Sequence, residues 1–109
     1  MKRLTIYGVK YIVNNEEYKE SVYFYNFDDA KKYSEYLSEK NKNITYTAFQ
    51  TTAQTLLNYY RELNALDSKS LLKSGEKSDL MHKFGLINYK IYKNYNEFLA
   101  SQENSGSEK

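Results

Sequence analysis

Two strand-like runs that feed directly into a helix constrain the fold of this chain more than any other feature. The runs Leu4–Val13 and Tyr18–Tyr25 are rich in β-branched and aromatic residues, whose side chains fit a pleated sheet. Asn14–Glu17 separates them, and asparagine tolerates the positive φ angles of turns. This order predicts a β-hairpin, followed by a helix over Asp28–Lys40 that Asn26 or Asp28 caps.

The loop of this hairpin has two readings, which differ in register. A two-residue loop of Asn14 and Asn15 places Lys10 opposite Lys19, and like charges directly opposite each other cost stability. We therefore favour a four-residue loop, Asn14–Glu17. The cross-strand pairs that the longer loop predicts are Val9 with Val22, Tyr7 with Phe24 and Tyr11 with Glu20.

Strand alternation divides the hairpin side chains between two faces, whichever loop forms. The face that we expect to be the core is contiguous and apolar, and it carries Tyr7, Val9, Tyr11, Val13, Val22 and Phe24. The other face carries Leu4, Ile6, Ile12, Tyr23 and Tyr25 together with Lys10, Lys19 and Ser21. Gly8 lies in mid-strand on this second face, which indicates a bulge or a close approach by another group.

The rest of the chain predicts further strands and helices. Ile44–Phe49 reads as a third strand, and Thr51 or Thr52 caps a helix over Ala53–Leu66. The apolar stripe of this helix contains Ala53, Leu56, Leu57, Tyr60 and Leu63, which leaves Tyr59 off the stripe. Leu86–Tyr92 reads as a fourth strand.

Two further short helices are expected in the C-terminal part of the chain. A brief helix capped by Ser78 or Asp79 is expected to end at Phe84, with Gly85 as its stop, and Asn94 opens a final short helix. The predicted fold is one α+β domain over residues 1–100: an antiparallel sheet begun by the hairpin, with both main helices packed mainly on one face. We expect residues 67–78 to be flexible and residues 101–109 to be a disordered tail.

Tyrosine dominates the composition and bears on function. The chain has 13 tyrosines and 5 phenylalanines but no cysteine, so disulfides and cysteine-based metal sites are excluded, and we expect a cytoplasmic protein. No apolar run approaches the roughly 20 residues that span a bilayer. The short chain, rich in Asn, Tyr and Lys and without proline, resembles in composition many small accessory proteins of bacteriophages and mobile elements. That resemblance covers no defined motif.

Catalytic motifs are missing from the sequence. His82 is the single histidine, and Asp79 could orient it from one helical turn away, but no nucleophile stands at a defined spacing. Asp28 and Asp29 could bind a cation, although helix capping explains them more simply. The glycines are scattered, so no phosphate-binding loop is present. We therefore expect no enzyme activity, no cofactor and no metal.

Two binding functions remain open. The surplus of tyrosines favours a protein-interaction module, since tyrosine is enriched in binding hot spots and 13 exceed what a small core hides. Such a module could sterically inhibit or modulate a host protein or nucleoprotein, for example a defence nuclease, or form a homodimer through a sheet edge. The candidate contact residues are Tyr18, Tyr23, Tyr25, Tyr36 and Tyr59.

The alternative function is a nucleic-acid-binding accessory domain. Basic and aromatic residues alternate near the C-terminal end, as phosphate pairing and base stacking require. The residues concerned are Lys83, Tyr89, Lys90, Tyr92 and Lys93. A net charge of only +2 predicts weak electrostatic attraction to a polyanion, so this reading ranks second.

Overall fold

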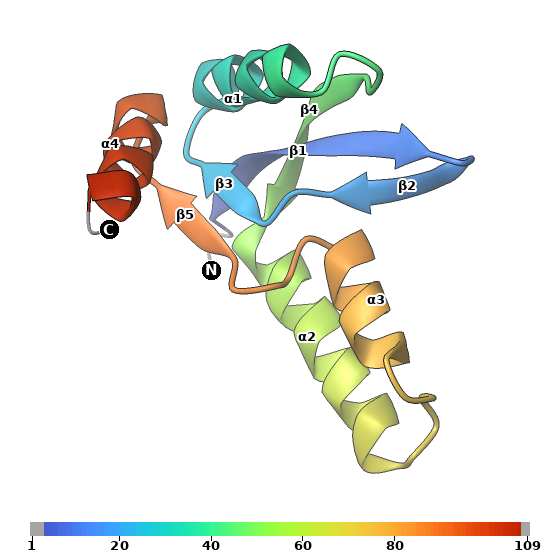
Figure 1. Cartoon of the computed structure of the whole chain (residues 1–109). Coiled ribbons are helices and arrows are strands. Elements are labelled where there is room, and N and C mark those ends of the chain that lie inside the picture. Colours follow the sequence, from blue (N-terminus) through green and yellow to red (C-terminus); the bar gives the residue numbers. More distant parts are fainter. Residues whose placement is uncertain (1–3, 108–109) are drawn as a thin grey trace.

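The chain folds around a five-stranded mixed sheet with helices on both sides (Figure 1). The computed structural model describes residues 4–107, and the α+β class with an N-terminal hairpin is confirmed. The strands are β1 (Thr5–Val13), β2 (Glu16–Lys19), β3 (Val22–Phe24), β4 (Tyr46–Thr52) and β5 (Lys90–Tyr92). The helices are α1 (Phe27–Lys40), α2 (Ala53–Ser68), α3 (Glu76–Lys83) and α4 (Tyr95–Ser107).

β1 is the central strand and pairs with neighbouring strands along both of its edges. On one edge it pairs antiparallel with β2 and then with β3, and on the other it pairs antiparallel with β4. The two edges are distinguished by two hydrogen bonds: the Val9 carbonyl accepts from Glu20 N–H (2.9 Å), whereas the Leu4 carbonyl accepts from Ala53 N–H (3.0 Å). β5 lies parallel to β3 and completes the sheet.

The hairpin turn is the shorter of the two readings, so the preference for a four-residue loop is wrong. Asn14 and Asn15 both have positive φ (54° and 66°), the conformation of a two-residue turn between twisted strands. Lys10 consequently lies opposite Lys19. The Glu17 carboxylate compensates for this like-charge pair, because its oxygens lie 3.6 Å and 3.5 Å from the two ammonium groups.

An interruption at Glu20 and Ser21 then restores part of the expected register. Tyr7 lies opposite Phe24, as predicted. Tyr11, however, lies opposite Tyr18 instead of Glu20, and Val9 receives the amide of Glu20 instead of pairing with Val22. The interruption shifts the register by an even number of residues, so each side chain keeps its predicted face.

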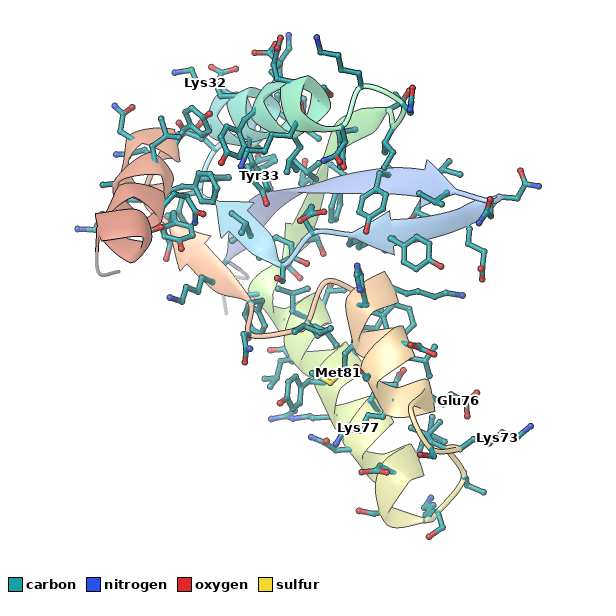
Figure 2. All side chains as sticks on the ribbon, in the orientation of Figure 1. Lys32, Tyr33, Lys73, Glu76, Lys77 and Met81 are labelled. Carbon is teal, nitrogen blue, oxygen red and sulfur yellow. The ribbon has the colours of Figure 1, made fainter. Side chains whose placement is uncertain are left out.

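Both faces of the sheet are covered, which differs from the expectation that the main helices pack mainly on one face. α1 and α4 cover the face that carries Val9 and Phe24, and α2 and α3 cover the face that carries Ile6 and Tyr23. All four of these strand residues are fully buried. Figure 2 shows Tyr33 pointing from α1 toward the sheet. The chain therefore has two small cores, one on each face.

Gly8 permits the closest approach in the core, as its mid-strand position predicted. A Cβ at this position would lie 2.7 Å and 2.8 Å from carbons of the Tyr23 ring. The ring of Tyr23 therefore packs directly over the backbone of β1.

Three helix starts carry the predicted caps, whereas α3 begins at Glu76 after Gly75 and has no side-chain cap, so the prediction that Ser78 or Asp79 caps it is wrong. Asn26 Oδ1 accepts from Asp29 N–H (3.0 Å), Thr52 Oγ1 from Thr55 N–H (3.1 Å), and Asn94 Oδ1 from Glu97 N–H (2.9 Å). Asp29 is buried, and its carboxylate accepts from Tyr95 N–H (3.0 Å), which ties the start of α4 to α1. This contact accounts for Asp29 without a cation.

The core side of α2 differs from the expected stripe at three positions. Tyr59 lies with Leu56 and Leu63 toward the core and stacks on Phe84 with ring centroids 4.8 Å apart. Leu57 and Tyr60, which were expected in the stripe, are 40% and 39% exposed. The difference follows from α3, which approaches α2 from the side of Tyr59.

The C-terminal third contains less strand than expected. α3 begins at Glu76, and Gly85 follows it with φ +69°, as a helix stop should. Asn88 also has positive φ (46°), so the backbone turns twice before β5, and the strand shrinks from the predicted Leu86–Tyr92 to its last residues. α4 continues to Ser107, and residues 108–109 lie outside the described part, so the expected tail from Ser101 stays a prediction.

Candidate functional site

Tyr23 is the predicted contact residue that the structure rules out. It is fully buried, and its hydroxyl donates to the Gly85 carbonyl (3.0 Å). The prediction packs both main helices mainly on one face of the sheet, whereas α2 covers the face that carries Tyr23. Tyr23 is therefore a core residue.

The other four predicted tyrosines differ in exposure. Tyr25 is 45% exposed. The remaining three are half-buried and pack on neighbouring rings: Tyr18 on Tyr11, Tyr36 on Phe98, and Tyr59 on Phe84. Of the five candidates, Tyr25 alone keeps a large free surface.

The basic and aromatic residues of the nucleic-acid alternative do not share one surface. The Tyr89 ring packs edge-on against Tyr23 on one face of the sheet, and Tyr92 packs beside Phe24 on the other. Lys83 is paired with Glu16 across the gap between α3 and β2. Lys90 and Lys93 are exposed. Tyr89 and Tyr92 thus lie on opposite faces of the sheet, so the rings that stacking would need together are apart.

A cluster of titratable groups fills the corner between β2, α1 and α3. Glu20 accepts a hydrogen bond from the Tyr33 hydroxyl (3.3 Å), and His82 Nε2 lies 3.0 Å from the Tyr11 hydroxyl. Two hollows meet at His82. The smaller, of about 190 Å³, is lined by Lys19, Glu20, Ser21, His82, Gly85 and Ile87, and the larger, of about 420 Å³, by Glu16, Tyr18, Glu76, Asp79, Leu80, His82 and Lys83.

Burial dominates the electrostatics of this corner. It raises the pKa of the Glu20 carboxyl, while the Tyr33 hydrogen bond and the nearby His82 act in the opposite direction. Burial first, and the Glu20 carboxylate second, raise the pKa of the Tyr11, Tyr33 and Tyr46 hydroxyls. These tyrosines therefore stay neutral donors at physiological pH.

The contacts at this corner join α3 to the hairpin. Among the described residues, no hydrogen bond connects His82 with Ser21 or with Glu20, and its Nε2 is engaged by Tyr11. The contacts hold α3 against the hairpin, and the Tyr18 ring meets the His82 ring edge-on at 5.5 Å. Within the same described part, no three His, Cys, Asp or Glu side chains are gathered as metal ligands.

The raised pKa of Glu20 gives a pH-dependent stability. Because the pKa of Glu20 is higher in the folded than in the unfolded protein, the folded state binds the proton more tightly, and stability falls as the pH rises from about 4.5 through the folded-state pKa. We expect Glu20→Gln to become more stable relative to the wild type between about pH 4 and pH 7, measured by urea unfolding at each pH. Glu39→Gln, at an exposed position on α1, is the control. A constant difference between Glu20→Gln and the wild type would contradict this assignment.

A set of exposed apolar side chains lies elsewhere, at one end of the sheet. We define the open end by five large side chains that are 39% to 47% exposed: Leu4, Tyr25, Phe27, Leu57 and Tyr60. Only Tyr25 among them was predicted as a contact residue.

The topology places the segments that carry these side chains at the same end of the sheet. β1 begins where β3 and β4 end, because both pair antiparallel with it. α1 starts directly after β3, and α2 starts with the amide of Ala53 on the Leu4 carbonyl. Figure 1 shows α2 leaving the sheet at this end. The sequence carries a signal for part of this surface, since no charged residue occurs from Asn43 to Tyr60.

Comparisons with known proteins give no family for the chain. It matches no protein-family model, no curated protein and no solved structure. None of the described helices is both long and apolar enough to cross a bilayer.

Proposed function

We propose that this protein is a non-enzymatic protein-interaction module that binds its partner through the open end. The observation that carries the proposal is that Leu4, Tyr25, Phe27, Leu57 and Tyr60, each 39% to 47% exposed, belong to segments that begin or end at the same end of the sheet. Apolar exposure gathered at one end of a small protein is typical of an interaction site. Aromatic side chains supply large, rigid contact area at low entropic cost.

The chemistry of the open end suits a protein partner better than a polyanion. Leu57 and Tyr60, its two residues on α2, belong to the stretch Asn43–Tyr60. This stretch contains no lysine or arginine that could pair with a phosphate. Burial of a side chain such as Leu57 or Tyr60 against an apolar partner contributes about 1 to 3 kcal/mol. A partner with a complementary apolar or aromatic patch would therefore be recognised.

The mode of action in this proposal is steric. A domain of 109 residues bound over a functional surface of a larger protein blocks access to it without chemistry of its own. The composition, which resembles that of phage and mobile-element accessory proteins, makes a host protein or nucleoprotein in the cytoplasm the proposed target. A defence nuclease is one example of such a target.

Affinity capture from a lysate of the host cell tests the class of partner. The bait carries its tag at the C-terminus, because Leu4 lies in the open end. We expect a protein to be retained equally with and without nuclease treatment, at about 0.15 M salt. Loss of the captured protein on nuclease treatment, or capture of nucleic acid alone, would overturn the proposal in favour of the nucleic-acid alternative.

A further inference from the structure

The sheet ends on one side in a long strand with a free edge. β4 has seven residues, and its register with β1 runs from Tyr11–Tyr46 to Thr5–Thr52 without a bulge. In the described part of the chain, β4 pairs with β1 and with no other strand. Its outer edge therefore offers unpaired backbone groups.

The groups that point outward can be assigned from the pairing. Ala53 N–H donates to the Leu4 carbonyl, so Thr47, Phe49 and Thr51 of the same strand direct their N–H and C=O groups toward β1. The alternate residues direct theirs outward. These are Tyr46, Ala48, Gln50 and, at the end of the strand, Thr52, and no hydrogen bond between described residues reaches the outward amides of the first three.

The other two edges of the sheet are protected, which sets β4 apart. The edge of β2 carries charged residues and is covered by α3 through the Lys83–Glu16 pair. β5 has only three residues and begins with Lys90. β4 has no lysine, glutamate or proline, the devices that normally block edge pairing, and it lies in the uncharged stretch Asn43–Tyr60.

We propose that β4 pairs with β4 of a second copy of this chain, antiparallel about a two-fold axis at Ala48. In this register Ala48 lies opposite its own symmetry mate, and Tyr46 lies opposite Gln50. The outward N–H and C=O groups of Tyr46, Ala48 and Gln50 then have partners, and two sheets join into one. The same patch contacts itself, as in most homodimers.

The charge distribution is compatible with a second copy of the chain as the partner of the β4 edge. β4 brings no like charges together, and a net charge of +2 opposes self-association only weakly. α1 packs over β4, and the two-fold axis runs the two α1 helices antiparallel. Each half of α1 carries exposed charges of both signs, Asp28, Lys31 and Lys32 in the first half and Glu35, Glu39 and Lys40 in the second, so the antiparallel helices bring no block of like charge together.

Single-cysteine crosslinking tests both the dimer and its register, because the chain has no native cysteine. In Ala48→Cys the two Cα atoms would lie about 5.5 Å apart, within disulfide range. In Gln50→Cys, the matched control on the same edge, they would lie more than about 13 Å apart. We expect mild oxidation to give a disulfide-linked dimer with Ala48→Cys and monomer with Gln50→Cys. Equal or faster crosslinking of Gln50→Cys would overturn the proposal.

Sedimentation of the cysteine-free protein supplies the second measurement. We expect a dimer at about 100 µM, and we expect Gln50→Pro to raise the dissociation constant at least about tenfold by removing one outward N–H from each strand. Gln50→Ala keeps the backbone N–H and should dimerise like the wild type. A monomeric wild type at this concentration would overturn the proposal. Partner capture at the open end is scored separately, so a monomer that still captures its partner would refute the dimer alone.

Discussion

Gly85→Ala is expected to lower the free energy of unfolding by about 3 kcal/mol, since two penalties combine at this position. Gly85 has φ +69°, where an L side chain costs about 1 to 2 kcal/mol. An alanine Cβ would also lie 2.3 Å from the Tyr23 hydroxyl oxygen and 2.9 Å from the Glu20 carbonyl. The hydroxyl cannot move away freely, because it is buried and donates to the Gly85 carbonyl. Urea unfolding followed by circular dichroism measures the loss.

Gly75→Ala is the matched control for this prediction. Gly75 also has positive φ (+84°), but an added Cβ would meet nothing within 4 Å. This variant should therefore lose only the conformational part, about 1 to 2 kcal/mol. Equal losses in the two variants would contradict the close packing of Tyr23 on Gly85.

Tyr23→Ala is expected to cost about 3 to 5 kcal/mol of stability, as full removal of a buried aromatic side chain does. The ring is fully buried between the backbone of Gly8 and the rings of Phe49 and Tyr89. Tyr23→Phe keeps the ring and loses the hydrogen bond, so it should cost about 1 to 3 kcal/mol. The same unfolding assay applies.

Tyr25→Ala provides the comparison with an exposed tyrosine two positions along the chain. Its side chain is 45% exposed, so its removal should change the free energy of unfolding by less than about 1 kcal/mol. If Tyr23→Ala proved no more destabilising than Tyr25→Ala, Tyr23 would not be the centre of a core.

Local chemistry made most of the fold predictable. β-branched and aromatic runs marked β1 to β3 and much of β4, and the caps at Asn26, Thr52 and Asn94 fixed where three helices begin. These features depend on residues close in sequence, which a single chain displays directly.

Features set by distant segments were predicted less well. The sequence predicts an uncompensated like-charge pair for Lys10 opposite Lys19, because it does not show that Glu17 lies between the two ammonium groups. The covering of both sheet faces depends on where α2 packs. Gly8 was the local hint, since the gap at this residue needs a large side chain, supplied by Tyr23, to fill it.

The sequence predicted a tyrosine-bearing binding surface, but it did not predict most of the residues that form the open end. An excess of tyrosine indicated a binding surface, but a tyrosine at a predicted surface position can equally fill a core, as Tyr23 and Tyr59 show. The open end joins residues from β1, the β3–α1 junction and α2, so only its uncharged α2 part is visible in the sequence.

Partner binding at the open end is measured most directly by comparing capture by two leucine variants. Leu57→Ser alters the open end, and Leu71→Ser alters an exposed leucine (63%) beyond the far end of α2. We expect Leu57→Ser to reduce the captured partner at least about tenfold and Leu71→Ser to leave it unchanged, with both variants as stable as the wild type. Undiminished capture by Leu57→Ser, or an equal loss in both variants, would contradict binding through the open end.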